Sequence, residues 1–244
     1  MLYIFEGTVF NAPVKTIVNT VNCSGVMGAG IALEFKLRFP GMMEDYKSKC
    51  ENKEVKLGRP YIYEYSDEIW IMNFPTKGHW RFPSKIQWIE EGLKYFSSNY
   101  KKREIDSIAF PKLGCSNGGL KWNEVKPLME KYLKELEMDI YICLDEKKEP
   151  EGIEKEMIES LNKFTVDDLS KTIKLSQKQA KIIADKMPIT RFREIERLEG
   201  VGERTYSKLF TFFYERALAV ENSGIDKGND VNIINEVEQL KFDI

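Results

Sequence analysis

The sequence predicts an α/β domain followed by a smaller all-α domain. Before residue 145, short apolar runs typical of buried strands alternate with segments whose apolar residues recur at helical spacing. Residues 145–152 contain no apolar side chain, which is typical of a link between two domains. The chain beyond this link has a helical pattern. We therefore expect an α/β domain over residues 1–150, a helical domain over residues 151–220, and a polar tail or short docked helix over residues 221–244.

The composition argues against several classes of protein. The chain has 244 residues, and its 37 basic and 39 acidic side chains give a net charge of -2, which neither favours nor excludes a nucleic-acid partner. Four separated cysteines, without a C-x-x-C pair, and a single histidine predict reduced thiols and no metal site. Neither a signal peptide nor a run of ~20 apolar residues is evident. We expect a cytoplasmic protein that uses no metal or cofactor and contacts no membrane.

The elements of the first domain follow one another in a regular order. Strands are expected over residues 2–5 and 16–21, both inside the sheet, and then over residues 61–65, 68–73, 105–110 and 140–144. Helices are expected over residues 31–39, 42–50, 84–100 and 123–137. In the third of these helices the spacing predicts a core-facing stripe made of Ile86, Ile89, Leu93 and Phe96.

Two glycine-rich loops connect strands to helices in this domain. They cover residues 19–32 and 111–122. Glycine at such a turn permits positive φ and lets backbone N–H groups approach a ligand closely, while the following helix N-terminus favours an anion. One such loop is as readily architectural as functional. Two at the carboxyl ends of strands in one sheet predict a ligand with two phosphates at that edge.

Neither glycine loop has the residues of a common nucleotide-binding motif. The order G-x-x-x-x-G-K-[ST] is missing, and so is G-x-G-x-x-G with an acidic residue about twenty positions further on. These absences argue against an ATPase and against a dinucleotide-binding enzyme of the common type.

A third segment of unusual composition, residues 73–84, follows the fourth strand. Two prolines stiffen it, its aromatic side chains offer flat apolar faces, and Lys77, His79 and Arg81 concentrate positive charge and capacity for proton transfer. Two interpretations stay open: a lid over a binding site, or a solvated connector whose aromatic rings cover the core.

The helical segment carries a possible nucleic-acid signal. Helices are expected over residues 154–161 and 165–187, and residues 189–210 have the order helix, glycine turn, helix. This order resembles the helix-hairpin-helix motif, whose turn presents backbone N–H groups to a DNA phosphate. Residues 171–216 are basic between acidic flanks. The DNA-binding candidates are Arg197, Gly200, Gly202, Arg204 and Lys208, and the alternative is a plain αα-hairpin.

Residues 19–36, 73–81 and 111–122 together resemble the macrodomain family, and within it the DarG-type antitoxins that remove ADP-ribose from thymidine in DNA. The resemblance covers about residues 1–150 and rests on the motifs N-T-V-N-x-x-G-V-M-G-x-G-I-A, N-F-P-T-K and P-x-L-G-C-x-x-G-G-L. It implies a three-layer α/β/α sandwich with a mixed sheet and ADP-ribose across its top edge. Thr8 stands where macrodomains usually carry an aspartate that recognises the adenine amino group.

The resemblance also implies roles for individual residues. Lys77 would be the catalytic group, Asn22 would lie beside the distal ribose, and both glycine loops would hold the diphosphate. The residues expected to line the substrate are Thr8, Val9, Asn22, Gly25, Val26, Met27, Gly28, Gly30, Ile31, Thr76, His79, Leu113, Gly114, Cys115, Ser116, Asn117, Gly118 and Gly119.

Three functions compete at this point. The leading one is a glycohydrolase that frees a nucleobase in DNA, most simply thymidine, from ADP-ribose, as antitoxin to a DNA ADP-ribosyltransferase, with a DarT-like toxin as candidate partner. The second is a reader that binds ADP-ribose without cleaving it. The third is a phosphatase acting on ADP-ribose 1″-phosphate. A reader has no use for the Lys77 cation at the scissile bond, and a phosphatase of a small molecule needs no DNA-binding segment.

Overall fold

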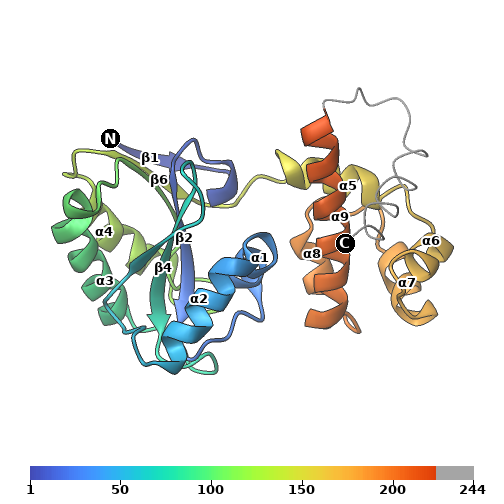
Figure 1. The fold of residues 1–244 in the computed structure, drawn as a ribbon, viewed down its shortest axis with the longest axis horizontal. Helices are drawn as coiled ribbons and strands as arrows, with labels where there is room; N and C mark the ends of the chain where they lie inside the picture. The colour runs from blue at the N-terminus through green and yellow to red at the C-terminus, as the bar shows by residue number, and fades with distance from the viewer. Residues whose placement is uncertain (224–244) are drawn as a thin grey trace.

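A six-stranded mixed sheet with the strand order β1-β6-β5-β2-β4-β3 organises the first part of the chain. The computed structural model describes residues 1–223 (Figure 1). The strands are β1 (Leu2–Phe5), β2 (Thr16–Asn22), β3 (Tyr61–Glu64), β4 (Trp70–Lys77), β5 (Ser107–Pro111) and β6 (Asp139–Cys143). Every neighbouring pair is parallel except β3 with β4. Five strands therefore end at the same edge of the sheet.

Helices cover both faces of this sheet, as Figure 1 shows. They are α1 (Gly30–Arg38) and α2 (Pro40–Glu51) on one face, and α3 (Ile86–Asn99) and α4 (Trp122–Leu133) on the other, with short 3-10 turns at Val9–Asn11 and Tyr100–Arg103. Each face has its own apolar core: Phe35 and Met42 belong to one, Leu93 and Met129 to the other. The predicted three-layer α/β/α sandwich with a mixed sheet is confirmed.

Three local predictions in this part are wrong. β1 is an edge strand, because it pairs only with β6, and Ile4 on it is half exposed. β4 continues to Lys77, so the first residues of the expected loop are strand. Pro75 is tolerated there because β3 pairs with β4 only as far as Asn73, so the missing N–H of proline breaks no ladder with β3. Ile86, the first residue of α3, is 41% exposed.

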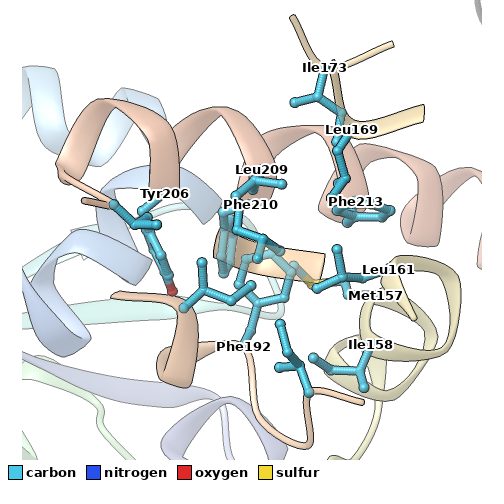
Figure 2. Close-up of a cluster of buried hydrophobic side chains, with 14 of the residues drawn as sticks. Met157, Ile158, Leu161, Leu169, Ile173, Phe192, Tyr206, Leu209, Phe210 and Phe213 are labelled. Atoms are coloured by element: carbon cyan, nitrogen blue, oxygen red, sulfur yellow. The ribbon is translucent and has the colours of Figure 1, made fainter. Parts of the chain in front are cut away.

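Beyond the link at residues 145–152, the described residues form helices joined by turns and loops, with no strand among them. These helices are α5 (Ile153–Leu161), α6 (Val166–Lys171), α7 (Gln177–Ala184), α8 (Arg193–Glu196) and α9 (Glu203–Ser223). Their core gathers around Phe192, Phe210 and Phe213, which face the side chains of α5 (Figure 2). None of the helices within residues 1–223 has the length and apolar character needed to cross a membrane. The docked helix expected near residues 231–240 lies outside the described residues.

The single helix expected over residues 165–187 is instead two helices, α6 and α7. Thr165 and Ser176 each form a capping box, in which the cap side chain and the residue three positions later exchange hydrogen bonds with backbone N–H groups. Between them the backbone of Lys174 is left-handed, with φ +56°. Ser176 has the extended backbone of an N-cap residue, so a helix cannot continue through it. The chain therefore ends α6 before Ser176 and begins α7 after it.

Helix α1 joins the two parts of the molecule. Its Phe35 belongs to the core under the sheet, whereas Leu33 is fully buried in the core of the helical part. Further along α1, the Arg38 guanidinium lies 5.6 Å from the Phe210 ring centroid and 5.0 Å from that of Tyr214. The helical part therefore docks on the helix that begins at the first glycine loop.

The link at residues 145–152 is held by a buried arginine. Arg191, 5% exposed, pairs with Asp145 at 3.0 Å and Glu154 at 2.9 Å, and donates to the Lys147 carbonyl at 2.6 Å. We expect Arg191→Met to lower the free energy of unfolding by about 3 kcal/mol, because it leaves the Glu154 carboxylate buried without its cation. Denaturant unfolding measures this. Lys101→Met is the control, and a parent-like midpoint for both variants would contradict the role given to Arg191.

Candidate functional site

The three segments singled out in the sequence meet at the carboxyl edge of the sheet. Asn22 and Lys77 are Cα partners at the ends of the parallel strands β2 and β4. The Lys77 ammonium donates a hydrogen bond to the backbone carbonyl of Asn117 in the second glycine loop. The Asn117 side-chain nitrogen lies 2.7 Å from where a Cβ would stand on Gly30 of the first glycine loop. Both loops and Lys77 therefore converge on Asn117.

The side chain of Asn22 shapes the first glycine loop. Its Oδ1 accepts hydrogen bonds from the Ser24 N–H at 2.9 Å and the Tyr46 hydroxyl at 3.0 Å, and its Nδ2 donates to the Val26 carbonyl at 2.6 Å. Burial raises the pKa of Tyr46, so this hydroxyl stays a donor. Asn22 is itself buried, so in this structure it acts through the loop that it holds.

The second glycine loop is fixed by contacts that only glycine permits. A Cβ on Gly118 would stand 2.2 Å from the Gly114 carbonyl oxygen and 2.5 Å from the Ser84 Oγ. The Ser84 N–H donates to the Gly118 carbonyl at 2.8 Å, which ties the start of α3 to this loop. Gly114 has a left-handed backbone with φ +69°.

The predicted substrate-lining residues differ in what they present to the edge. Four have side chains buried in the core and support the loops from below, namely Val9, Met27, Thr76 and Leu113. Gly114 and Gly118 are also buried. More accessible are Thr8, Gly25, Val26, Gly28, Gly30, Ile31, His79, Cys115, Ser116, Asn117 and Gly119. Thr8 follows β1, which two strands separate from β2, and its hydroxyl donates to Asn11 at 2.6 Å.

The aromatic segment after Lys77 is open to solvent. Trp80 is 45% and Phe82 64% exposed, and the His79 ring lies between them with centroid distances of 5.8 and 5.5 Å. The Arg81 guanidinium lies 4.7 Å from the Trp80 ring centroid. The Trp80 N–H donates to the Ser24 hydroxyl at 3.4 Å, so the rings stand beside the first glycine loop. Trp80 and Phe82 therefore do not cover the core, whereas Phe74 at the start of the segment is fully buried in it.

Among the nucleophilic side chains near the glycine loops, Lys77 differs from Cys23 and Cys115 in the direction of its pKa shift. Partial burial lowers the pKa of the Lys77 amine, which increases the neutral fraction near neutral pH. Burial has the opposite effect on the neighbouring thiols: it raises the pKa of Cys23 to about 11 and raises that of Cys115. Both thiols are therefore protonated and weak nucleophiles.

Two acidic residues that the sequence did not single out touch the first glycine loop. The Gly30 N–H donates to the Glu196 Oε1 at 2.8 Å, although 166 positions separate them. Glu203 pairs with Lys36 at 2.8 Å, and its other oxygen lies 3.1 Å from where a Cβ would stand on Gly28. No local pattern marks either residue, because the contacts arise only when the helical part docks on α1.

The candidates for DNA binding lie together on the surface. Val201 is buried between Gly200, which has φ +90°, and Gly202, and α9 starts directly after this turn. The preceding helix α8 has only four residues, so the expected helix, turn and helix are present with a short first member. All five candidates, Arg197, Gly200, Gly202, Arg204 and Lys208, are exposed.

Comparison with known proteins places the sandwich and its loops in a class. Residues 18–129 match the Macro domain family. A solved macrodomain of Thermus aquaticus DarG is 42% identical, with a TM-score of 0.56, over 59% of this chain and 98% of that one. Thermosipho africanus DarTG, solved in complex with ADP-ribose, is 40% identical with a TM-score of 0.57, over 61% of this chain and 43% of that one. This chain belongs to the macrodomain family.

Curated relatives carry a specific activity in their names. A DNA ADP-ribosyl glycohydrolase of Thermus aquaticus is 44% identical over 140 residues, which are 56% of this chain and 39% of that protein. A DNA ADP-ribosyl transferase-DNA ADP-ribosyl glycohydrolase fusion protein of Thermosipho africanus is 38% identical over 161 residues, 59% of this chain and 42% of that protein. This chain thus spans about two fifths of the length of these relatives.

Proposed function

We propose that this protein is a hydrolase that removes ADP-ribose from thymidine in DNA and acts as antitoxin to a DNA ADP-ribosyltransferase. The observation that carries the proposal is the convergence of Lys77 with both glycine loops at Asn117. The names of the relatives support it, and so does the ADP-ribose complex of Thermosipho africanus DarTG. A DarT-like toxin is the proposed partner, and the cytoplasm the proposed compartment.

In this proposal the two glycine loops hold the diphosphate. Backbone N–H groups of residues 25–31 and 114–119 donate to its oxygens, and the N-terminus of α1 adds a favourable dipole. Asn22 keeps the first loop in shape through its bonds to Ser24 and Val26. The ribose then lies between the loops with its anomeric carbon toward Lys77, where positioning alone contributes to the rate.

The reaction breaks the bond between the anomeric carbon and a base nitrogen. The electron pair of this bond leaves with the base, which takes up a proton, and water supplies the hydroxyl group of the freed ADP-ribose. Lys77 serves in one of two ways. In the first, its neutral amine attacks the anomeric carbon of the ring-opened sugar and expels the base, and water then hydrolyses the resulting imine to free the lysine. In the second, its ammonium form gives the proton to the departing base. The lowered pKa of Lys77 serves both routes, because it increases the neutral fraction of the amine and makes the ammonium form a stronger acid.

The aromatic segment supports a DNA substrate over a small one. Exposed rings at Trp80 and Phe82, with Arg81 beside them, have the chemistry that stacks on unpaired bases. They follow Lys77 directly in the chain, so a base next to the modified one comes within their reach.

Removing the charge of Glu196 should strengthen ADP-ribose binding. Its carboxylate occupies the Gly30 N–H, beside the proposed diphosphate, and like charges there repel each other. Glu196→Gln keeps an oxygen that accepts the same hydrogen bond, so the docking is retained. We expect calorimetry to show an affinity about threefold higher or more, an effect that shrinks in high salt. Equal affinity at low salt would place the diphosphate away from Gly30. Glu199→Gln is the matched control.

The proposed function is tested with a single-stranded oligonucleotide carrying ADP-ribosyl thymidine. The protein should release free ADP-ribose and leave the unmodified strand. Tight binding without release would indicate a reader instead. Release of phosphate from ADP-ribose 1″-phosphate, with the oligonucleotide untouched, would indicate a phosphatase.

A further inference from the structure

A groove of about 900 Å³ runs along α9, next to the site described above. Its walls come from α9, from the link between α6 and α7, and from α1. In Figure 1, α9 stands between α1 and the α6–α7 pair. Four basic side chains line the groove, namely Lys36, Lys174, Arg204 and Lys208, against the two carboxylates of Glu203 and Glu215.

Three of these cations have no carboxylate partner. Within residues 1–223, no ion pair engages Lys174, Arg204 or Lys208, and all three are exposed. Other surface lysines, such as Lys101 and Lys131, do pair with glutamates. Because four basic side chains face two carboxylates, the groove has a net positive charge and attracts an anionic ligand.

Three of the five neutral residues of the groove carry a hydroxyl group, which favours phosphate as that anion, while Ile173 and Phe212 are apolar. The hydroxyl groups of Thr172, Ser207 and Thr211 line the groove between the basic side chains. Arg204 and Lys208 stand one helical turn apart on α9, so they offer charge along the groove and not at a single point. Basic and hydroxyl side chains in a row are the usual contacts to a nucleic-acid backbone.

The groove also begins at the proposed substrate site. Glu203 lines it, and the same carboxylate pairs with Lys36 and reaches toward Gly28 in the first glycine loop. When the ADP-ribose of a modified base is bound in that loop, the neighbouring phosphates of the same DNA strand lie close to the groove. The basic side chains of the groove can then contact these phosphates.

We propose that this groove binds the backbone of the DNA strand that carries the modified base, in part through Lys174, which lies outside the glycine turn of the hairpin. The proposal rests on the proposed function for the identity of the strand. It makes the helical part a substrate-holding element whose position is set by its docking on α1. The groove is independent of the Gly200 and Gly202 backbone contacts expected from the hairpin.

The test uses unmodified single-stranded DNA and the full chain. Fluorescence anisotropy compares the parent with Lys174→Gln, Arg204→Gln and the double variant, with Lys186→Gln as control because Lys186 is exposed but does not line the groove. We expect the double variant to lose about tenfold in affinity at low salt. Each single variant should lower the log–log salt slope by about 0.7, as for one lost phosphate contact. ADP-ribose affinity, measured by calorimetry, reports that each variant is folded.

Three results would overturn the groove proposal. The first is parent-like DNA affinity in the double variant. The second is an equal loss in the Lys186→Gln control. The third is polyglutamate binding as tightly as DNA and weakened by the same variants, which would assign the groove to an acidic polypeptide. The proposed function is tested separately, by the release of ADP-ribose from the modified oligonucleotide. If the groove variants lose DNA affinity but the parent protein releases no ADP-ribose, only the proposed function is refuted.

Discussion

Replacing Lys77 by alanine or arginine should reduce the release of ADP-ribose from modified DNA about a hundredfold or more, while ADP-ribose affinity stays within about threefold of the parent. The Lys77 amine lies at the end of β4, donates to the Asn117 carbonyl of the second glycine loop, and has a lowered pKa. Arginine keeps the positive charge but can neither attack as an amine nor give up its proton. Single-turnover release measures the reaction, and Lys85→Ala is a matched control on an exposed lysine nearby.

The outcome for Lys77→Arg separates chemistry from electrostatics. Near-parental release would limit Lys77 to attracting a phosphate. The pH dependence then separates the two chemical routes. If the neutral amine attacks, the rate rises with pH up to the lowered pKa of Lys77 and then levels, because deprotonation creates the nucleophile. If the ammonium form donates the proton, the rate falls as pH rises through the same pKa.

Gly118→Ala should abolish ADP-ribose binding and lower the free energy of unfolding by about 2 kcal/mol or more. The added Cβ would overlap the Gly114 carbonyl and the Ser84 Oγ, and the first of these is backbone that cannot rotate away. The second loop must therefore move, and its N–H groups lose their alignment. Calorimetry and denaturant unfolding measure the two effects.

Two other glycines serve as controls for this prediction. A Cβ on Gly202 would meet nothing within 4 Å, and Gly202 has no left-handed φ. We therefore expect Gly202→Ala to keep the ADP-ribose affinity and the free energy of unfolding of the parent. A Cβ on Gly28 would meet the flexible end of the Glu203 side chain at 3.1 Å and the Val26 Cγ1 in ordinary contact at 3.9 Å, so we expect Gly28→Ala to keep normal stability and to bind ADP-ribose more weakly. Parent-like binding in Gly118→Ala would show that the second loop does not hold the ligand.

Much of the fold follows from local patterns in the sequence. Apolar runs and helical spacing predict nearly every element of the α/β part, because a residue's own neighbours decide whether it is strand or helix. The position of β1 at the edge is not predicted, since strand pairing is set by long-range contacts. The break between α6 and α7 has a local signal that helical spacing alone overlooks, because Ser176 and Gln179 form a capping box that starts a new helix.

Some residues of the candidate site can be predicted from local sequence, and others cannot. The glycine loops and Lys77 are visible in the sequence because their chemistry is carried by adjacent residues, and parallel strands bring them to one edge. Glu196 and Glu203 are not visible, because they reach the first loop from the far end of the chain. The full engagement of Asn22 with its own loop also required the three-dimensional structure.

A crystal structure with ADP-ribose bound would show where the diphosphate and the anomeric carbon lie. We expect diphosphate oxygens within hydrogen-bond distance of backbone N–H groups in both residues 25–31 and 114–119. We also expect the anomeric carbon within reach of the Lys77 Nζ. A diphosphate that touches only one loop, or an anomeric carbon that faces away from Lys77, would contradict this arrangement.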